Sequence, residues 1–327
     1  MLDKFGRKIE YMRVSITDRC DLRCRYCMPE GIEKVSMSQI LTYEEIIRIC
    51  RAASELGISK IKITGGEPFV RLGCTGLMRE IKAIDGIEEV TVTTNGQTLE
   101  KYIDELMDIG IDGINISLDT LDPERFEYIT GRGELGKTLR AIELAAGSGI
   151  KTKINTLLQK EFNEDEIKDI AALAFRYGID VRFIEMMPVG AADAEAGLSN
   201  TEVLKKLMEI WPDLEPDGSV HGNGPAVYYR RPGVKGSIGL ISAIHGKFCQ
   251  YCNRVRLTSQ GQLKPCLGFD TGTDLMPVLK RPHDETDHEL KEVLRKAIID
   301  KPKAHSFSDE GNASDHAEQR LMSQIGG

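Results

Sequence analysis

Six of the eight cysteines in this 327-residue chain fall into two groups of three. The first cysteine group is Cys20, Cys24 and Cys27, and the second is Cys249, Cys252 and Cys266. A structural zinc site takes four ligands and disulfides use cysteines in pairs, so three cysteines on one loop are typical of neither. A cubane iron–sulfur cluster has four irons, usually held by four cysteines. Three cysteines would leave one iron open, where a small molecule can bind and receive an electron.

Zinc remains an alternative for the second group. His245 lies four residues before Cys249, and on spacing alone a site of three cysteines and one histidine is as good an interpretation as a cluster. The C-x3-C-x2-C spacing of the first group is less typical of zinc, whose cysteine pairs usually come as C-x2-C with a matching second pair. Cys50 lies in a helical pattern of isoleucines and is expected in the core, and we assign no role to Cys74.

The composition limits the classes of protein to consider. The formal net charge is −8, which argues against a general nucleic-acid binder and means that any site for a polyanion is a local basic cluster. No apolar run reaches the roughly 18 residues of a membrane helix, and MLDKFGRKIEYMRV lacks the pattern of a signal peptide. We therefore expect a cytoplasmic protein without membrane association, whose cysteines are free thiols or metal ligands.

Short β-type runs alternate with helical patterns through the first half of the chain. The runs cover residues 11–17, 60–64, 89–94, 113–119, 151–158 and 180–186. Six strands connected by helices imply a parallel sheet with right-handed crossovers. Thr42 and Glu45 have the spacing of a capping box at one helix start, and Asn163 and Glu166 mark another start less strongly.

Five of these runs alternate between polar and mostly apolar residues. In the second run, Lys60, Lys62 and Thr64 alternate with Ile61 and Ile63. Successive strand residues point to opposite faces, so the apolar faces would meet the helices and the polar faces would converge on an interior. A closed eight-stranded barrel fills its interior with branched apolar side chains instead. We therefore expect a partial, open barrel with a polar ligand in its lumen.

The pattern changes after about residue 190. A long connection rich in Pro and Gly and several short strands replace the regular alternation, and the last stretch is polar with few large apolar residues. We divide the chain into a barrel over 1–195, a C-terminal α+β extension over 196–301 that carries the second cysteine group, and a flexible tail over 302–327 that ends in Gly-Gly.

CDLRCRYCMP resembles the signature of radical S-adenosylmethionine (SAM) enzymes, and TGGEP at residues 64–68 resembles a glycine-rich turn of that family. The resemblance implies an α/β fold with a partial (β/α)6 TIM-like barrel. It also implies a [4Fe-4S] cluster on the first cysteine group, with the amine and carboxylate of SAM on the open iron. The residues that fall at the family's SAM contacts are Tyr26, Gly66, Ser117 and Met187.

FCQYCNRVRLTSQGQLKPCL, residues 248–267, is similar to the C-terminal signature of the GTP 3′,8-cyclase family, which begins molybdenum cofactor biosynthesis. This similarity implies a second [4Fe-4S] cluster, whose open iron binds the guanine of GTP. The implied GTP contacts are Arg13, Lys62, Thr93, Lys153, Arg254, Val255 and Arg256, with Lys62 where we expect arginine in the family. The implied catalytic residues are Arg254, Arg256, Gly326 and Gly327, because the Gly-Gly end of the family reaches into the active site.

The same resemblance implies the reaction and its partners. A 5′-deoxyadenosyl radical from SAM takes hydrogen from C3′ of the GTP ribose, and the carbon radical attacks C8 of guanine. The implied partners are GTP, an external electron donor, cyclic pyranopterin monophosphate synthase as the next enzyme and a second copy of the chain in a homodimer. Two alternatives remain: a radical SAM maturase that modifies a peptide and carries an auxiliary cluster, and a zinc-bearing binding protein without catalysis.

Overall fold

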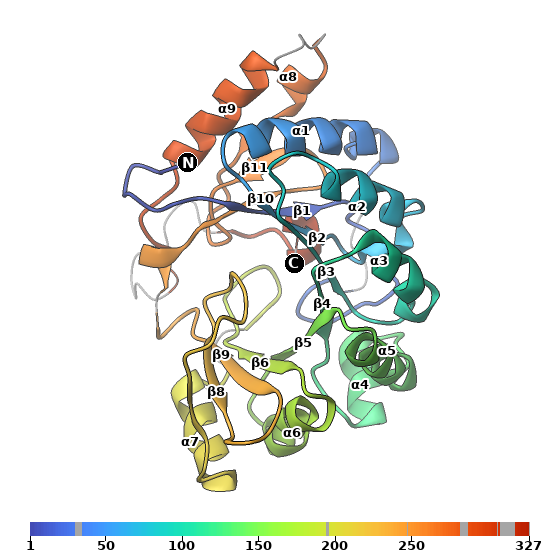
Figure 1. Ribbon diagram of the computed structural model, residues 1–327, viewed down its shortest axis with the longest axis vertical. Coiled ribbons are helices and arrows are strands. Elements are labelled where there is room, and N and C mark those ends of the chain that lie inside the picture. The colour runs from blue at the N-terminus through green and yellow to red at the C-terminus, as the bar shows by residue number, and fades with distance from the viewer. Residues whose placement is uncertain are drawn as a thin grey trace.

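The computed structural model describes residues 1–29, 35–193, 196–246, 248–281, 287–305, 307 and 318–326. One curved 12-stranded sheet has the order β12-β11-β10-β1-β2-β3-β4-β5-β6-β9-β8-β7 (Figure 1). The strands are β1 (Tyr11–Ser15), β2 (Lys60–Thr64), β3 (Glu89–Thr94), β4 (Gly113–Ser117), β5 (Lys151–Leu157), β6 (Asp180–Ile184), β7 (Glu215–Asp217), β8 (Val227–Arg230), β9 (Ser237–Ile241), β10 (Arg254–Leu257), β11 (Gln262–Lys264) and β12 (Thr273–Asp274).

Helices connect the strands and line the outside of the sheet. The α-helices are α1 (Tyr43–Glu55), α2 (Cys74–Lys82), α3 (Ile103–Ile109), α4 (Pro123–Thr130), α5 (Leu135–Gly147), α6 (Ile167–Tyr177), α7 (Asn200–Ile210), α8 (Met276–Leu279), α9 (His288–Ile299) and α10 (Met322–Ile325). Single turns of 3-10 helix are η1 (Met37–Gln39), η2 (Pro68–Val70), η3 (Leu99–Lys101), η4 (Glu164–Glu166) and η6 (Cys249–Tyr251).

Strands β1 to β6 form the expected partial barrel. Each pairs in parallel with the next along the chain, for example with Arg13 opposite Lys62 and Thr93 opposite Asn115. Helices α1 to α6 follow one another around the outside of these strands (Figure 1). This arrangement leaves the inner face of the sheet, which we call the lumen, for the polar residues of each strand.

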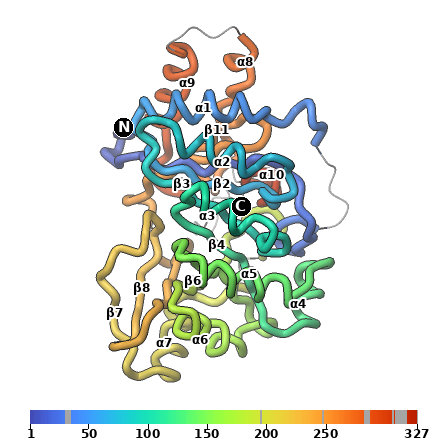
Figure 2. Tube along the Cα trace, turned by 45° about the vertical axis from the view of Figure 1, so that its right-hand side comes forward, coloured from blue at the N-terminus to red at the C-terminus, as the bar shows by residue number. Residues whose placement is uncertain are grey.

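Strands from the C-terminal part of the chain extend the sheet at both edges of the barrel. β10 pairs in parallel with β1, with Arg13 opposite Arg256, and β9 pairs in parallel with β6. The antiparallel strands β11 and β12 continue beyond β10, and β8 and β7 continue beyond β9. An open six-stranded sheet would expose two unpaired edges, and these strands cover both of them. Helix α9 packs on α1, and α7 packs on α6 and β9 (Figures 1 and 2).

The core lies between the outer face of the sheet and the helices. The predicted apolar strand positions are all buried there, and in β2 Ile61 and Ile63 are 0% exposed. Cys50 on α1 is buried in the same core, as expected, and Cys74 is buried at the start of α2. No helix of the described residues combines the length and the apolar character needed to cross a membrane.

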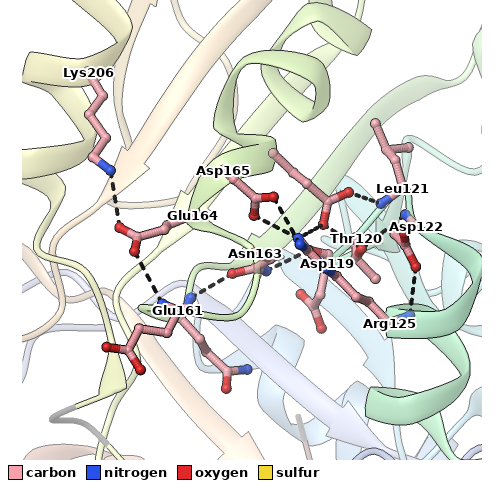
Figure 3. A network of polar contacts seen from close by, with 12 residues as sticks. Asp119, Thr120, Leu121, Asp122, Arg125, Glu161, Asn163, Glu164, Asp165 and Lys206 are labelled. Carbon is pink, nitrogen blue, oxygen red and sulfur yellow. Dashed lines mark hydrogen bonds and ion pairs between the residues drawn. The ribbon is translucent and has the colours of Figure 1, made fainter.

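The two predicted helix starts differ in how they are capped. Before α1, Thr42 Oγ1 accepts a hydrogen bond from Glu45 N and Glu45 Oε2 accepts one from Thr42 N, so the capping box is present. Asn163 is the N-cap position of η4, which leads directly into α6, so the second helix start is also present, although the Asn163 side chain makes no capping hydrogen bond. Asn163 and Glu166 are instead buried and bind backbone groups that follow β4 and β5 (Figure 3).

Candidate active site in the barrel lumen

All six cysteines of the two groups line one cavity of about 340 Å³, which we call the cysteine cavity. The first group lies on the loop that follows β1, and the second lies on η6 and directly after β11. Because β10 runs parallel to β1, the first group lies beyond the C-terminal end of these two strands and the second lies at their N-terminal end, and the cavity along the inner face of the sheet joins them. Residues 229 positions apart in sequence, Cys20 and Cys249, therefore face a common space.

The first cysteine group is half-buried among uncharged and acidic surroundings. Burial raises the pKa of the Cys27 thiol to about 12 and raises that of Cys24 well above its usual value. For Cys20, burial and the nearby Glu67 both raise the pKa. These thiols are protonated at neutral pH on their own, so thiolates here require a bound metal to balance their charge.

The second cysteine group has a basic environment. Burial would raise the pKa of Cys252, but the positive charges of Lys301, Arg254 and Arg7 lower it overall. Arg7 also donates a hydrogen bond of 2.8 Å to the carbonyl oxygen of Cys249. Sequence reasoning missed Arg7 and Lys301, because neither lies near a cysteine in the chain.

The zinc alternative receives no support from the geometry. The His245 side chain is 66% exposed, and its Nδ1 lies 3.3 Å from Glu185 Oε1. Nowhere in the described ranges do three His, Cys, Asp or Glu side chains approach closely enough to share one metal ion. A cubane cluster does not need this proximity, since its three cysteines bind three different irons.

The TGGEP turn is packed tightly against the start of the first cysteine loop. A Cβ atom on Gly66 would lie 2.3 Å from the carbonyl oxygen of Arg19, and one on Gly65 would lie 2.7 Å from that of Thr17. The Glu67 carboxylate accepts hydrogen bonds of 2.7 Å from Thr94 Oγ1 and from Asn95 N, which fixes the turn to the end of β3. Only glycine fits at these two positions, and the turn forms part of the cavity wall.

The four residues predicted to contact SAM, Tyr26, Gly66, Ser117 and Met187, all line the cysteine cavity. Tyr26 also donates a hydrogen bond of 2.8 Å to Asp119 Oδ2, and Leu157 N donates one of 2.9 Å to Asp119 Oδ1. Burial raises the pKa of Asp119 to about 6, although the hydrogen bonds from Leu157 and Tyr26 oppose this shift. Sequence reasoning assigned Asp119 no role, although its inward position in the fourth run was a signal.

A polar network binds the backbone at and just after Asp119 (Figure 3). Asn163 is 0% exposed, and its side-chain amide donates hydrogen bonds of 2.6 Å to Asp119 O and 2.9 Å to Leu157 O. Glu166 accepts hydrogen bonds from Thr120 Oγ1 and Leu121 N. The network therefore holds the ends of β4 and β5 at the spacing that places Asp119 beside Tyr26.

Three arginines from two neighbouring strands face the lumen. Arg13 on β1 and Arg254 and Arg256 on β10 all line the cysteine cavity. Val255 does not join them, because alternate strand residues point to opposite faces and its side chain is 1% exposed in the apolar core. The predicted Val255 contact with substrate is therefore incorrect for its side chain.

A second cavity of about 360 Å³, which we call the basic cavity, continues the lumen toward the N-terminal ends of strands β2 to β5. Arg13, Thr93 and Arg254 line both cavities, whereas Lys62 and Lys153 line only the basic one. Burial lowers the pKa of Lys62 well below its usual value, and the charges of Arg182 and Arg13 lower it further. Within the described residues, the buried Nε atoms of Arg182 and Arg254 have no hydrogen-bond partner. Such crowded cations are expected where a polyanion binds.

Lys153 differs from Lys62 in having several partners within the protein. Its ammonium donates to the carbonyl oxygen of His221, lies 3.0 Å from the hydroxyl of Tyr228 and pairs with Asp180 Oδ2 at 2.9 Å. A contact between Lys153 and a substrate phosphate therefore requires exchange of one of these partners.

Comparison with known proteins identifies the family. The Radical SAM superfamily model matches residues 14–174, and the Molybdenum Cofactor Synthesis C model matches residues 179–307. GTP 3′,8-cyclase of Peptoclostridium acidaminophilum is 47% identical over 94% of both chains, and that of Clostridium perfringens is 40% identical over the full length of both. The chain belongs to the GTP 3′,8-cyclase family.

Solved structures of much lower sequence identity share the fold. Streptococcus suis SuiB bound to S-adenosylmethionine superimposes with a TM-score of 0.65 at 16% identity, over 90% of this chain and 68% of that one. Native anSMEcpe with bound AdoMet gives a TM-score of 0.56 at 16% identity, over 86% and 82%. At this identity the likeness concerns the fold alone.

GTP 3′,8-cyclases of the radical SAM superfamily use SAM and [4Fe-4S] clusters, and the cysteine cavity fits such groups. It offers two sets of three thiols and a glycine turn that a side chain would fill. It also contains Thr64 Oγ1 and Asn155 Oδ1, two buried atoms without a hydrogen-bond partner among the residues described. These features suit a polar ligand beside two metal clusters.

The C-terminal segment of the chain, which we expected to be flexible, is packed into the lumen at residues 318–326. The carbonyl oxygen of Gly326 accepts a hydrogen bond of 2.5 Å from Arg256 Nη1, and a Cβ atom on Gly326 would lie 2.9 Å from Ser15 Cβ. Gly326 therefore lies at the end of β1, beside an arginine that was predicted to be catalytic. Gly327, the other predicted tail residue, lies outside the described residues.

Proposed function

We propose that this chain converts GTP into (8S)-3′,8-cyclo-7,8-dihydroguanosine 5′-triphosphate, the first step of molybdenum cofactor biosynthesis. The observation that carries the proposal is the cysteine cavity, whose wall combines both cysteine groups with Arg13, Arg254 and Arg256. Family membership supports the same reaction. A polyanionic nucleotide can thus lie between two sites at which iron has one coordination position open.

The residues of the cysteine cavity divide into two sets by role. Cys20, Cys24 and Cys27 would hold the first cluster, and Tyr26, Gly66, Ser117 and Met187 would contact SAM. Cys249, Cys252 and Cys266 would hold the second cluster. When bound, the reduced first cluster and SAM supply the radical that removes hydrogen from C3′ of the ribose.

The chain itself binds and orients the nucleotide. Arg13, Arg254 and Arg256 carry planar guanidiniums that form paired, charge-assisted hydrogen bonds with phosphate oxygens. Lys62 lies deeper in the lumen, where a bound anion would favour its charged form, but it lacks the two-pronged geometry of arginine. Two reactants held at near-attack distance in an enclosed site supply a large part of the rate, and exclusion of water protects a radical from side reactions.

A peptide-modifying activity is less well supported by this lumen. Peptide backbones are uncharged, whereas the basic cavity concentrates the cations Lys62, Arg13 and Arg182, and the buried Nε of Arg182 has no hydrogen-bond partner among the described residues. Buried cations are costly without anions, so a triphosphate explains them and a peptide does not.

The proposed function also defines partners. The reaction requires an external electron donor, and its product would pass to cyclic pyranopterin monophosphate synthase. We propose both as partners, together with a homodimeric state in the cytoplasm. Equilibrium sedimentation of the purified chain tests the homodimer, which a monomer at micromolar concentration contradicts.

The reaction can be tested with isotope-labelled substrate. Anaerobically reconstituted protein is incubated with SAM, a reductant and GTP deuterated at C3′, and both products are analysed by mass spectrometry. We expect GTP-dependent 5′-deoxyadenosine that carries deuterium, together with the cyclised nucleotide. Absence of deuterium transfer, or 5′-deoxyadenosine without any cyclised product, contradicts the proposal.

A variant pair tests the assigned phosphate contacts. Arg13→Gln removes one charged donor from the lumen and should weaken GTP binding about 10- to 100-fold, as for loss of a hydrogen bond to a charged group. Arg140→Gln is the matched control, because Arg140 lies on the outer helix α5 and is 49% exposed. Equal GTP affinity in both variants would contradict a contact between Arg13 and GTP.

A further inference from the structure

A fully buried ion pair attaches the C-terminal segment, residues 318–326, to the sheet. Lys264 on β11 pairs with Glu318, and both side chains are 0% exposed. The Lys264 ammonium also donates to the carbonyl oxygen of Phe269. Replacement of a buried ion pair by apolar residues is often neutral or stabilising, so such a pair is weak evidence for stability and is better explained by a need for one specific arrangement.

Arg320 strengthens the same attachment. Its guanidinium donates hydrogen bonds of 3.0 Å to Glu318, 2.6 Å to Gln262 Oε1 and 2.9 Å to the carbonyl oxygen of Asp270. The beginning of the C-terminal segment is thus joined to β11 and to the loop that follows it. That loop carries Cys266 of the second cysteine group, only two residues after Lys264.

The other end of the C-terminal segment meets the active site. Ser323 and Ile325 are almost fully buried, and Met322 lines the cysteine cavity. Gly326 then accepts the hydrogen bond from Arg256. The segment therefore runs from a buried charged attachment at Glu318 to Gly326, eight residues later, which contacts the lumen residue Arg256, and α10 is its only regular structure among the described residues.

We propose that Lys264, Glu318 and Arg320 form a positioning anchor that fixes the register of the C-terminal segment and so orients Arg256 toward the substrate. A shift of the segment by one residue would move the Gly326 carbonyl away from Arg256, and a shift that brings Ile325 to this place would set a Cβ atom against Ser15, where it does not fit. Packing of short apolar side chains alone discriminates weakly between registers, whereas a shift that separates Lys264 from Glu318 would leave a buried charge without its partner, which is costly. The inference rests on the proposed function, since Arg256 matters only if the lumen binds the nucleotide.

The test separates positioning from stability. Glu318→Gln and Lys264→Met each break the pair, whereas the double variant Lys264→Met/Glu318→Leu replaces it with an apolar contact. The matched control is Arg48→Met, which breaks the Arg48–Asp287 pair between α1 and the start of α9, where the side chains are 16% and 20% exposed. For each protein, cyclised nucleotide per 5′-deoxyadenosine, iron content and the urea midpoint of unfolding are measured.

We expect both single variants to retain iron and SAM cleavage while cyclised product per 5′-deoxyadenosine falls on the order of 10- to 100-fold, as for a slight misplacement of a catalytic group. The double variant should recover the urea midpoint but not this ratio, because it restores packing without restoring register. Trypsin, which cleaves after Arg320, should release residues 321–327 faster in all three variants. Arg48→Met should lower the midpoint and leave the ratio unchanged.

The anchor is contradicted if the single variants keep the ratio of the unmodified chain, or if the double variant restores ratio and midpoint together. Should the single variants fail to fold, Arg320→Gln provides the test, because Arg320 is 33% exposed and its loss is milder. A smaller fall in the ratio supports the anchor, and an unchanged ratio contradicts it. If the unmodified chain yields no cyclised product, the proposed function itself is wrong.

Discussion

The carbonyl oxygen of Gly326 accepts a hydrogen bond from the guanidinium of Arg256, although 70 residues separate them in sequence. Arg256 lies on β10, a strand from the C-terminal part of the chain that pairs with the first barrel strand. The same lumen therefore combines the loop after β1, an added edge strand and the C-terminal segment. Each of these three parts contributes something that the others lack: thiols, positive charge and a backbone carbonyl.

Gly326→Ala should impair cyclisation without loss of either cluster. Gly326 has a φ of +81°, and an added Cβ would lie 2.9 Å from Ser15 Cβ, so local strain of about 1–3 kcal/mol would displace the segment. Product formation and iron content are measured together. Gly136→Ala on α5 is the control, since an added Cβ there meets nothing within 4 Å and should stabilise that helix by about 0.5–1 kcal/mol. Full activity of Gly326→Ala contradicts the role of the segment.

Cys266→Ser should remove the second cluster and leave the first. Iron content should fall from roughly eight atoms per chain to roughly four, because each cubane holds four irons. GTP should bind more weakly, while SAM still binds at the first cluster. Cys50→Ala is the matched control, since Cys50 is buried in the core on α1 and should leave the iron content unchanged. An unchanged iron content in Cys266→Ser excludes this residue as a ligand.

Asn163→Ala should weaken SAM binding more than GTP binding. The substitution leaves the carbonyl oxygens of Asp119 and Leu157 without their buried donor, at a cost of about 1–3 kcal/mol, and loosens Asp119 beside Tyr26 (Figure 3). Lys206→Gln is a control from the same region, because its pair with Glu164 is largely solvated and worth at most about 1 kcal/mol. Affinities for SAM and GTP are measured separately, and an equal loss of both would indicate general unfolding.

Glu10→Gln should destabilise the fold at neutral pH and have less effect in acid. Hydrogen bonds from Lys60 and then Lys8 lower the pKa of Glu10 from 4.5 to about 2. A carboxylate whose pKa is lower in the folded state than in the unfolded state stabilises the fold at pH values above its ordinary pKa. This stabilisation is lost as pH falls from about 4.5 toward 2. At pH 7 the loss should be no more than about 1 kcal/mol, since the carboxylate is partly solvated.

Urea unfolding at pH 7 and pH 3.5 checks this dependence. The difference between Glu10→Gln and the unmodified chain should shrink at the lower pH. Glu134→Gln, from an ion pair whose glutamate is 66% exposed, should show almost no difference at either pH. A destabilisation by Glu10→Gln that is equal at both pH values contradicts the role of the charge.

Much of the cysteine cavity could be predicted from the sequence, because the decisive signals are local. The C-x3-C-x2-C spacing, the glycine turn and the alternation of polar and apolar strand residues each arise within a few positions. Strand periodicity alone indicates that Lys62 faces inward and Ile61 outward, since the backbone geometry of a strand is the same in every fold. The capping box before α1 was predictable for the same reason.

Only the tertiary structure decided which distant segments share the lumen. No local pattern requires β10 to pair with β1, or Asn163 to bind the ends of two strands rather than cap its own helix. The burial of Lys264 with Glu318 likewise cannot be predicted from the residues that neighbour them in sequence. The physical reason is that strand edges and buried polar groups must be satisfied by whatever partner the complete fold brings to them. Residue types therefore determined what chemistry this chain can perform, and long-range pairing determined where the reactive groups meet.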